Sequence, residues 1–539
     1  TSPPRKRSLS PAQRRKKALA LSLNPPPRSF TVEAVCAIPH PVPTHALAAS
    51  ACMTHLLTGS DDGYVRDYDI FAAVNSKNFL TAPQRHHAGV VEGLMKSGQL
   101  RFWWENPTLH DTNRPGILSV EEESGLAPVY SLAMQSDALW ALAGTDAGYI
   151  NLFTLRHEPG KLCHVMNTQS RSPISALCLD YDEKGFFSAG WDGVAIQWDL
   201  NTGQNVRNFT AHHAQLTSIS LRPAAPYYTS PTGPIHTSSQ ARRSFNQIQS
   251  ELNGVAGSPG TGDEPSFEMN LIKSETVQAV NMESDARSDA SFDPLFDDVS
   301  EDMMQTPAPT ESKLAMPGSS NVHQPVMPRE LISSTIPPPK GAPPLIDVLG
   351  YQSYSSDILM TAFIDGQVIL WDRRVQNNGR GVGRLWINEK TPPWCLSACW
   401  STDGAQIYAG RRNGSVDVWD VRVLGQSGPT NTPRLLKTLR NPASSGVVSC
   451  VVPFPDCRHI ACASVDNIRL WNVAENVEDG ISKTKSGVQF KIIPGHHGGY
   501  ISQMLVDPGA RFLVSASSNR GLHGDSTRTV FVHDIKHIH

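Results

Sequence analysis

Short runs of alternating apolar and polar residues recur along the chain, and each is followed by the same order of features. In the clearest unit, the alternating run 174–179 precedes the small residues 188–190, the turn Trp191-Asp192-Gly193 and a further run that ends at Trp198-Asp199. Such alternation is typical of strands with one buried face. An Asp-Gly pair favours a tight hairpin turn, because glycine accepts a positive φ without steric cost. The unit is therefore predicted to be a small antiparallel sheet.

Seven such units follow one another, with different degrees of divergence. Their turns and their closing aromatic residues are Asp62 and Tyr68, Asp146 and Phe153, Asp192 and Trp198, Asp365 and Trp371, Asn413 and Trp419, Asp466 and Trp471, and Ser518 and Phe531. Where no long segment intervenes, the position after the aromatic recurs after 45 residues (154 to 199), 48 (372 to 420) and 52 (420 to 472). A four-stranded propeller blade takes roughly 40–45 residues. The pattern predicts an all-β fold, a seven-bladed β-propeller.

These units resemble WD repeats over about residues 30–539, apart from one long insertion. The resemblance implies that the aromatic residue of the third strand packs between blades. It also implies that the turn aspartate accepts a hydrogen bond from a histidine at the start of the blade. The candidate histidines are His45, His212 or His213, and His496 or His497; blades five and six show none, so we expect weaker networks there. Because the repeat accounts for these histidines, a structural role is favoured over a catalytic one.

The two ends of the propeller are expected to meet in blade seven. The last unit ends at residue 534 with little chain left for a fourth strand, whereas the alternating stretch 30–38 precedes the first unit and has no other blade. We expect 30–38 to complete blade seven, which removes exposed sheet edges. The propeller is thus assigned to 29–223, with blades one to three and the start of blade four, and to 343–539.

Two segments outside the repeat differ sharply in charge. Residues 1–28 carry eight Lys or Arg and no acid, in the clusters Arg5–Arg7 and Arg14–Lys17, which predicts a disordered basic arm with a nuclear import signal or a nucleic-acid contact. Residues 224–342 are rich in Pro, Ser and acids, and this composition predicts a disordered insertion within blade four. Its part 251–304 has thirteen acids against two bases.

Two stretches are candidates for partner binding. In the insertion, Phe292, Leu295 and Phe296 alternate with aspartates and are able to dock on a basic, apolar surface; the alternative is a loop kept soluble by its acids. An enlarged link at 75–125, between blades one and two, is expected to contain a short helix at 89–95. Its candidate contact residues are Arg85, His86, His87, Arg101, Trp103 and Trp104. Trp and Arg are enriched in binding hot spots, but packing of these side chains on the propeller wall is an equal alternative.

Composition narrows the function classes. The net charge of −3 argues against a bulk nucleic-acid binder, so direct nucleic-acid contact is expected at most through the basic arm. The nine cysteines lack the spacing of a zinc site or a disulfide framework, and no apolar run approaches the roughly 20 residues that span a bilayer. No nucleophile elbow, metalloprotease motif, P-loop or Rossmann glycine pattern is present in the sequence. We therefore expect a soluble intracellular protein that is not an enzyme, with no metal, cofactor, small-molecule substrate or membrane contact.

Three stretches carry a more specific resemblance. The runs 55–70, 78–93 and 99–106, together with Trp371-Asp-Arg-Arg374 and the acidic interruption of a middle blade, resemble the Spt-class WD-repeat subunit of the fungal SAGA transcription coactivator complex. This resemblance implies a nuclear, non-catalytic scaffold that assembles with other SAGA subunits. It also implies engagement of TATA-binding protein, to regulate its delivery to promoters. Much of the surface of that partner is basic, so the acidic segment is complementary in sign.

Two other functions are open to such a propeller. Trp371-Asp-Arg-Arg374 and Trp419-Asp-Val-Arg422 resemble the adaptor-docking box of substrate receptors of cullin ubiquitin ligases. A reader of histone tails would instead use the axial opening. Co-purification with a cullin adaptor would favour the first alternative, whereas the second is compatible with a coactivator role.

Overall fold

A computed structural model describes the propeller and part of the N-terminal arm. The described residues are 11–21, 25, 27–75, 99–108, 125–223, 339–375, 380–388, 391–425, 428–429, 431–474, 490–496, 499–518 and 527–539. The insertion 224–338 lies outside the described residues, and with it the proposed contact residues Phe292, Leu295 and Phe296.

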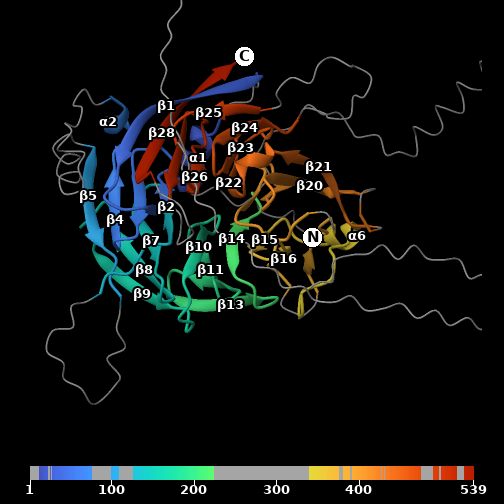
Figure 1. Cartoon of the computed structure of the whole chain (residues 1–539). Coiled ribbons are helices and arrows are strands. Elements are labelled where there is room, and N and C mark those ends of the chain that lie inside the picture. The colour runs from blue at the N-terminus through green and yellow to red at the C-terminus, as the bar shows by residue number, and fades with distance from the viewer. Residues whose placement is uncertain are drawn as a thin grey trace, which may run out of the picture. The chain divides into compact units, whose positions relative to one another are not determined.

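Among the described residues, the strands form seven four-stranded antiparallel sheets, which Figure 1 shows arranged in chain order around one axis. The first three blades are β2 (Thr44–Ala49), β3 (Leu56–Ser60), β4 (Tyr64–Tyr68) and β5 (Leu100–Glu105); β6 (Ser131–Met134), β7 (Trp140–Gly144), β8 (Tyr149–Thr154) and β9 (Leu162–Asn167); and β10 (Ile174–Leu179), β11 (Gly185–Gly190), β12 (Val194–Asp199) and β13 (Gln204–Thr210). The predicted seven-bladed propeller is confirmed.

The remaining blades repeat the arrangement. They are β14 (Leu216–Leu221), β15 (Ile358–Phe363), β16 (Val368–Asp372) and β17 (Val382–Arg384); β18 (Ala398–Trp400), β19 (Gln406–Gly410), β20 (Ser415–Leu424) and β21 (Pro433–Arg440); β22 (Val448–Pro453), β23 (His459–Ser464), β24 (Ile468–Asn472) and β25 (Phe490–Ile493); and β26 (Ile501–Val506), β27 (Phe512–Ser517), β28 (Thr529–Ile538) and β1 (Ser29–Pro39). The described helices are α1 (Pro11–Leu19), α2 (Ile70–Asn75), α6 (Val348–Tyr351) and the 3₁₀ turn η1 (Ala443–Ser445).

The hydrophobic core lies between neighbouring blades. In one cluster, Phe187 and Phe209 of blade three pack with Leu216, Leu359 and Trp371 of blade four. Each blade is buried on both faces by its neighbours, so its second strand reads as a continuous run of small and apolar residues, which is the pattern of doubly covered strands.

Glycines in the second strands permit this close packing. A Cβ atom added to Gly144 of blade two would lie 2.8 Å from the Cβ atom of Ile174 in blade three, and one added to Gly59 would lie 2.8 Å from the Cβ atom of Val129. Contacts this short do not occur between carbon atoms. The small residues before each turn are therefore required for blade-to-blade contact.

The Asp-Gly turns adopt the conformation that the sequence indicates. Gly193 has a φ of 83° and Gly366 a φ of 94°, a region that only glycine enters without strain. The Asp192 carboxylate accepts the backbone N–H of Val194 at 3.0 Å, and Asp365 accepts that of Gln367 at 3.1 Å. Each turn thus carries its own hydrogen-bonding cap.

Strand β1 occupies the outer edge of blade seven, where the sequence places the closing strand. It pairs with β28 from Ser29↔Ile538 to Pro39↔Thr529, with one irregularity between Ala34 and Cys36. Figure 1 shows the two together, blue beside red. Blade seven therefore contains strands from both ends of the described chain.

The expectation of a disordered N-terminal arm is corrected for its described part. Residues Pro11–Leu19 form helix α1, and Leu21 is buried in the core cluster that also contains Phe30 and Ala510. Arg15 forms an ion pair with Asp137, and Lys16 one with Glu183. Ala, Leu, Gln, Arg and Lys all have high helix propensity, and acids of the propeller supply the partners that the arm itself lacks.

Candidate partner-binding surfaces

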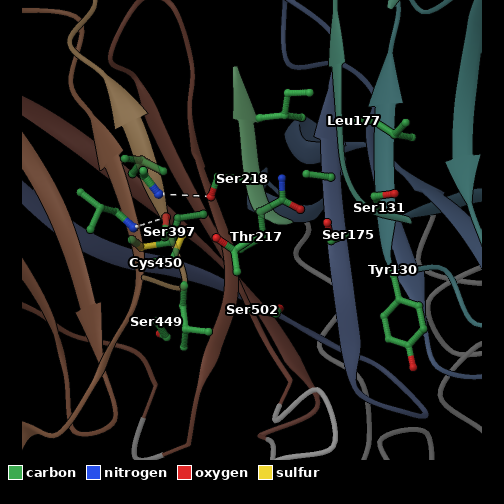
Figure 2. Close-up of a pocket in the computed structure, with 18 of the residues that line it drawn as sticks. Tyr130, Ser131, Ser175, Leu177, Thr217, Ser218, Ser397, Ser449, Cys450 and Ser502 are labelled. Atoms are coloured by element: carbon green, nitrogen blue, oxygen red, sulfur yellow. Dashed lines mark hydrogen bonds between the residues drawn. The ribbon is translucent and has the colours of Figure 1, made fainter. Parts of the chain in front are cut away.

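The first strands of the blades line a central channel with hydroxyl groups. The channel has a volume of about 190 Å³. Figure 2 shows the groups that surround it: Ser131, Ser175, Thr217, Ser397, Ser449 and Ser502, which come from blades two to seven. In blade one the corresponding residue, the one that follows Thr44, is His45. The channel is therefore small and polar.

Most of these hydroxyl groups connect one blade to the next. Ser131 Oγ donates to the carbonyl of Ile174 at 2.8 Å, and Ser502 Oγ donates to that of Thr44 at 2.6 Å. Ser397 Oγ accepts the backbone N–H of Val451 at 3.0 Å. These groups fix the blade spacing, so the channel wall is first of all a structural element.

The predicted His–Asp pair is present in blade four. His212 Nε2 lies 2.8 Å from Asp365 Oδ2, and its ring packs 4.3 Å from that of Phe363. Below it, Trp371 Nε1 donates to Thr361 Oγ1 at 2.9 Å. His212 thus links the blade entrance to the turn, and Trp371 links the third strand to the second.

In blade one His45 pairs with a turn aspartate as expected, but with Asp61 rather than Asp62, and a second histidine takes the position beside the third-strand aromatic. The histidine next to the third-strand aromatic is His40, whose Nε2 lies 3.0 Å from Thr58 Oγ1 and whose ring lies 5.2 Å from that of Tyr68. Burial lowers the pKa of His40 to about 3, so it is neutral. His45 instead lies 3.0 Å from Asp61 and 2.7 Å from Ser518 Oγ of blade seven, through its two ring nitrogens.

Blade seven has a histidine where the other blades have an aromatic residue. His533 pairs with Leu513 in the register in which Trp371 pairs with Leu359, so His533 rather than Phe531 takes that position. Its Nε2 lies 3.1 Å from Ser515 Oγ, which is also 3.0 Å from His496 Nε2. This network carries the predicted entrance histidine but no aspartate.

Blades one, five and six contain arginine-centred ion pairs. Arg411 Nε donates to Asp417 Oδ2 at 2.9 Å within blade five. In blade six Arg469 Nη2 donates to Asp466 Oδ2 at 2.6 Å, and in blade one Arg66 Nη2 lies 2.5 Å from Asp62 Oδ2. Blades five and six, where the sequence shows no entrance histidine, therefore contain a buried arginine that sequence reasoning missed.

The third-strand aromatic residues named as structural are buried. The side chains of Tyr68, Trp198, Trp371, Trp419 and Trp471 all lie in the core. Trp198 Nε1 donates to Ser188 Oγ at 2.9 Å, and Trp471 Nε1 donates to Asn441 Oδ1 at 3.3 Å.

The stretch with the paired tryptophans is not part of a link. Leu100–Glu105 is β5, the outer strand of blade one, and it pairs with β4 from Tyr64↔Glu105 to Tyr68↔Leu100. The reading of residues 75–125 as one connection between blades is therefore corrected. Arg85, His86, His87 and the expected helix at 89–95 lie outside the described residues.

Alternation along β5 separates its candidate contact residues. Trp104 faces inward with 8% of its surface exposed, and its ring lies 5.8 Å from that of Phe153 in blade two. Trp103 faces outward and is 39% exposed. Arg101 Nη2 lies 2.5 Å from Asp69 Oδ2 and donates to the carbonyl of Thr54 at 3.2 Å. Trp104 therefore packs on the propeller wall, whereas Trp103 is accessible.

The arginines of the two Trp-Asp-x-Arg motifs are also accessible. Arg374 approaches Asp372 at 3.7 Å, and Arg422 Nη2 donates to Asp420 Oδ2 at 2.8 Å, each with most of the side chain exposed. Arg373, the residue before Arg374, has 10% of its side chain exposed and joins Asp180 of blade three to Asp357.

The part of the chain that the structure describes contains no group of three or more His, Cys, Asp or Glu residues placed to hold a metal ion. None of its helices is long and apolar enough to cross a membrane.

Comparison with known proteins places the chain. A family model described as the SPT8 beta propeller matches residues 30–308 and 347–536. The chain belongs to the SPT8 β-propeller family. It is 32% identical over 519 residues to the SAGA complex subunit SPT8 of Saccharomyces cerevisiae. The matched region covers 94% of this chain and 73% of that protein. It is 31% identical over 506 residues to the SAGA complex subunit Spt8 of Schizosaccharomyces pombe, and this match covers 94% of the chain and 79% of that protein.

A more distant similarity covers a smaller part of the chain. The Polycomb group protein FIE1 of Oryza sativa subsp. japonica is 26% identical over 126 residues, or 22% of this chain and 32% of that protein. The two yeast relatives confirm the family resemblance that the runs 55–70, 78–93 and 99–106 indicate.

Proposed function

We propose that the chain is a non-enzymatic scaffold subunit of a nuclear, SAGA-type transcription coactivator complex. The observation that carries this proposal is the similarity over 94% of the chain to two proteins named as SAGA complex subunits. The similarity includes the whole propeller rather than a few repeats. A propeller of this type supports assembly because its wall and faces offer several separate surfaces on one rigid body.

The proposal extends to engagement of TATA-binding protein, to regulate its delivery to promoters. Trp103 is a suitable anchor, because a rigid aromatic side chain contributes much contact area at little entropic cost. Arg101, on the same face of β5, is held by Asp69. The acidic residues of 251–304 supply complementary charge for a basic partner, which speeds association more than it raises affinity.

A scaffold also agrees with the use of the polar groups. Among the described residues, several of the histidines and hydroxyls that face the channel or the blade entrances form bonds within or between blades, as for His212 with Asp365 and Ser131 with Ile174. A hydrolase needs a nucleophile and a base that point together into an accessible pocket. The proposed role therefore uses surfaces rather than a reaction centre.

Affinity purification of the tagged chain from nuclei tests the assembly. We expect other SAGA subunits to co-purify with the chain and the Trp103→Ala variant to lose part of the TATA-binding protein. Trp191→Ala is a matched control, since Trp191 is 36% exposed in blade three. Co-purification of a cullin adaptor that Arg374→Ala with Arg422→Ala abolishes, with no SAGA subunit, would instead establish a ubiquitin-ligase receptor.

A further inference from the structure

Helix α1 lies on one face of the propeller, across the loops that join first and second strands. Arg15 Nε donates to Asp137 Oδ1 at 2.7 Å in the loop between β6 and β7, and Lys16 Nζ lies 3.4 Å from Glu183 Oε1 in the loop between β10 and β11. Beyond the helix, Leu21 N donates to the carbonyl of Pro508 at 2.8 Å, between β26 and β27. The segment therefore reaches from blades two and three to blade seven on that face.

The propeller itself holds the acidic receptor for this helix in place. The Glu183 side chain is only 8% exposed and accepts hydrogen bonds from Gln135 Nε2 at 2.8 Å and from the backbone N–H of Ser136 at 3.3 Å. The Ser136 hydroxyl donates to the same carboxylate. These bonds span blades two and three and involve no atom of α1. A nearly buried carboxylate of this kind favours a cationic neighbour, because an uncompensated charge away from water is costly.

The bond to Arg15 is the main cause of the altered acidity of Asp137. It holds the pKa of that carboxyl below its usual range, with a further contribution from the charge of Arg15 itself. The acidic pair thus binds two consecutive basic residues, Arg15 and Lys16, which lie about one turn before the apolar end of α1 at Leu19.

Helix α1 is weakly held on this receptor. It has nine residues, and a helix this short is not stable by itself in water. The side chains of Arg15 and Lys16 remain about half exposed, and exposed ion pairs contribute little. A cavity of about 350 Å³ also remains beside the helix, lined by Leu19, Cys52, Leu139 and Arg156 among others. The site is therefore larger than the segment that occupies it.

We infer that this face, around Asp137 and Glu183, is a docking site for a basic helical segment of a partner protein, and that α1 occupies it as an intramolecular competitor. Its tether gives α1 a high effective concentration, so the site is closed in the isolated chain. A partner segment with the same charge pattern and more apolar surface displaces it by filling the adjoining cavity. This inference goes beyond the scaffold role and does not depend on TATA-binding protein.

Fluorescence anisotropy with a labelled synthetic peptide of residues 8–22 tests the site in the full chain. The natural chain should bind the peptide weakly, because α1 competes with it. Arg15→Glu with Lys16→Glu should release α1 and raise the affinity for the added peptide by about tenfold or more. Adding Asp137→Asn and Glu183→Gln to that opened chain should abolish the gain.

The controls separate this site from general charge effects. Glu158→Gln removes an exposed acid of blade two that pairs only locally with Lys161, so it should leave peptide binding unchanged. Trypsin should cleave within 14–17 faster in a chain with Asp137→Asn and Glu183→Gln, whose α1 keeps all its basic residues, than in the natural one. Thermal melting checks that every variant is folded, and Arg15→Gln with Lys16→Gln replaces the charge-reversed pair if that pair does not fold. Equal peptide binding by natural and opened chains, or binding that survives loss of both carboxylates, would overturn the inference.

Discussion

Arg411 connects two blades through a buried charge. Its side chain is fully buried, with Nε donating to Asp417 and Nη1 donating to the carbonyl of Gly366 in blade four at 2.8 Å. Its guanidinium also lies 5.4 Å from the centre of the Trp419 ring. Because both Arg411 and Asp417 are buried, removal of one partner destabilises the fold strongly, whereas replacement of both by apolar residues costs little stability.

We predict that Arg411→Leu lowers the free energy of unfolding by about 3–5 kcal/mol, because Asp417 then remains buried without its counter-charge. The double variant Arg411→Leu with Asp417→Leu should lose clearly less. Urea unfolding of the two variants and the natural chain measures both values. A double variant that is less stable than the single one would show that the pair, and not the orphaned carboxylate, accounts for the loss.

His533 gives blade seven a dependence on pH. Burial, with a smaller effect of the charge on His496, lowers the pKa of His533 to about 3 from the ordinary 6.5. Between these two values the unfolded chain binds a proton at this residue and the native chain does not. The free energy of unfolding that depends on neutral His533 is therefore fully present above pH 6.5 and declines as the pH falls toward 3.

We predict that His533→Phe makes the stability less sensitive to acid. The slope of the unfolding free energy against pH between 6 and 4 should decrease relative to the natural chain, by at most about 1.4 kcal/mol per pH unit for one proton. Denaturant titrations at pH 7.5, 6 and 4.5 measure the slopes. Parallel curves for the two proteins would contradict the account.

The sequence identified part of these networks. It predicted His212 and the aromatic positions of blades one to six, because the aromatic follows the turn residue by six positions in four of these blades, as Trp371 follows Asp365. It named His45 and not His40, because His40 directly follows the closing strand and so belongs in sequence to another blade. The arginine pairs gave no repeated signal, because Arg411 precedes its aspartate whereas Arg469 follows its own.

Strand β1 holds the propeller closed through a few buried side chains. Phe30 is fully buried, and its ring lies 5.2 Å from that of Phe454 in blade six. Val35, at the register irregularity of the same strand, is exposed. The strand therefore joins blade seven to blade six as well as to β28.

We predict that Phe30→Ala lowers the free energy of unfolding by about 3–5 kcal/mol, through lost burial and the cavity that remains. Val35→Ser, the matched control, should change it by less than about 0.5 kcal/mol. Deletion of residues 30–38 should abolish the cooperative transition altogether. Calorimetry on the three variants measures this, and an unchanged transition after the deletion would show that closure lies elsewhere.

Two elements escaped prediction for different reasons. Strand β5 follows β4 only after the stretch 76–98, so its tryptophans looked like part of a connection rather than like a fourth strand. Helix α1 contacts residues that are distant in sequence: Arg15 and its ion-pair partner Asp137 are separated by 122 positions. A run of basic residues without acids nearby in sequence predicts a solvated arm. The acidic partners of this run come close to it only in the folded propeller.

On the scale of the whole molecule, the blades form one rigid body that keeps its surfaces apart. Bonds such as that from Leu47 N to Gln503 Oε1, at 2.7 Å, connect blade one to blade seven and complete the ring. Trp103 then lies on the outer strand of blade one, and the receptor for α1 lies on the face built by the loops between first and second strands. Partners that bind these surfaces are able to do so independently.

We propose that this scaffold engages TATA-binding protein. The most direct test is a pull-down with purified TATA-binding protein at two salt concentrations. It compares the full chain with the Trp103→Ala variant and with a chain in which 224–338 are replaced by a short Gly-Ser linker. We predict retention by the full chain that weakens at the higher salt, as expected for complementary charges, and a smaller amount retained by each altered chain. Failure of the full chain to retain TATA-binding protein at either salt concentration would contradict the claim.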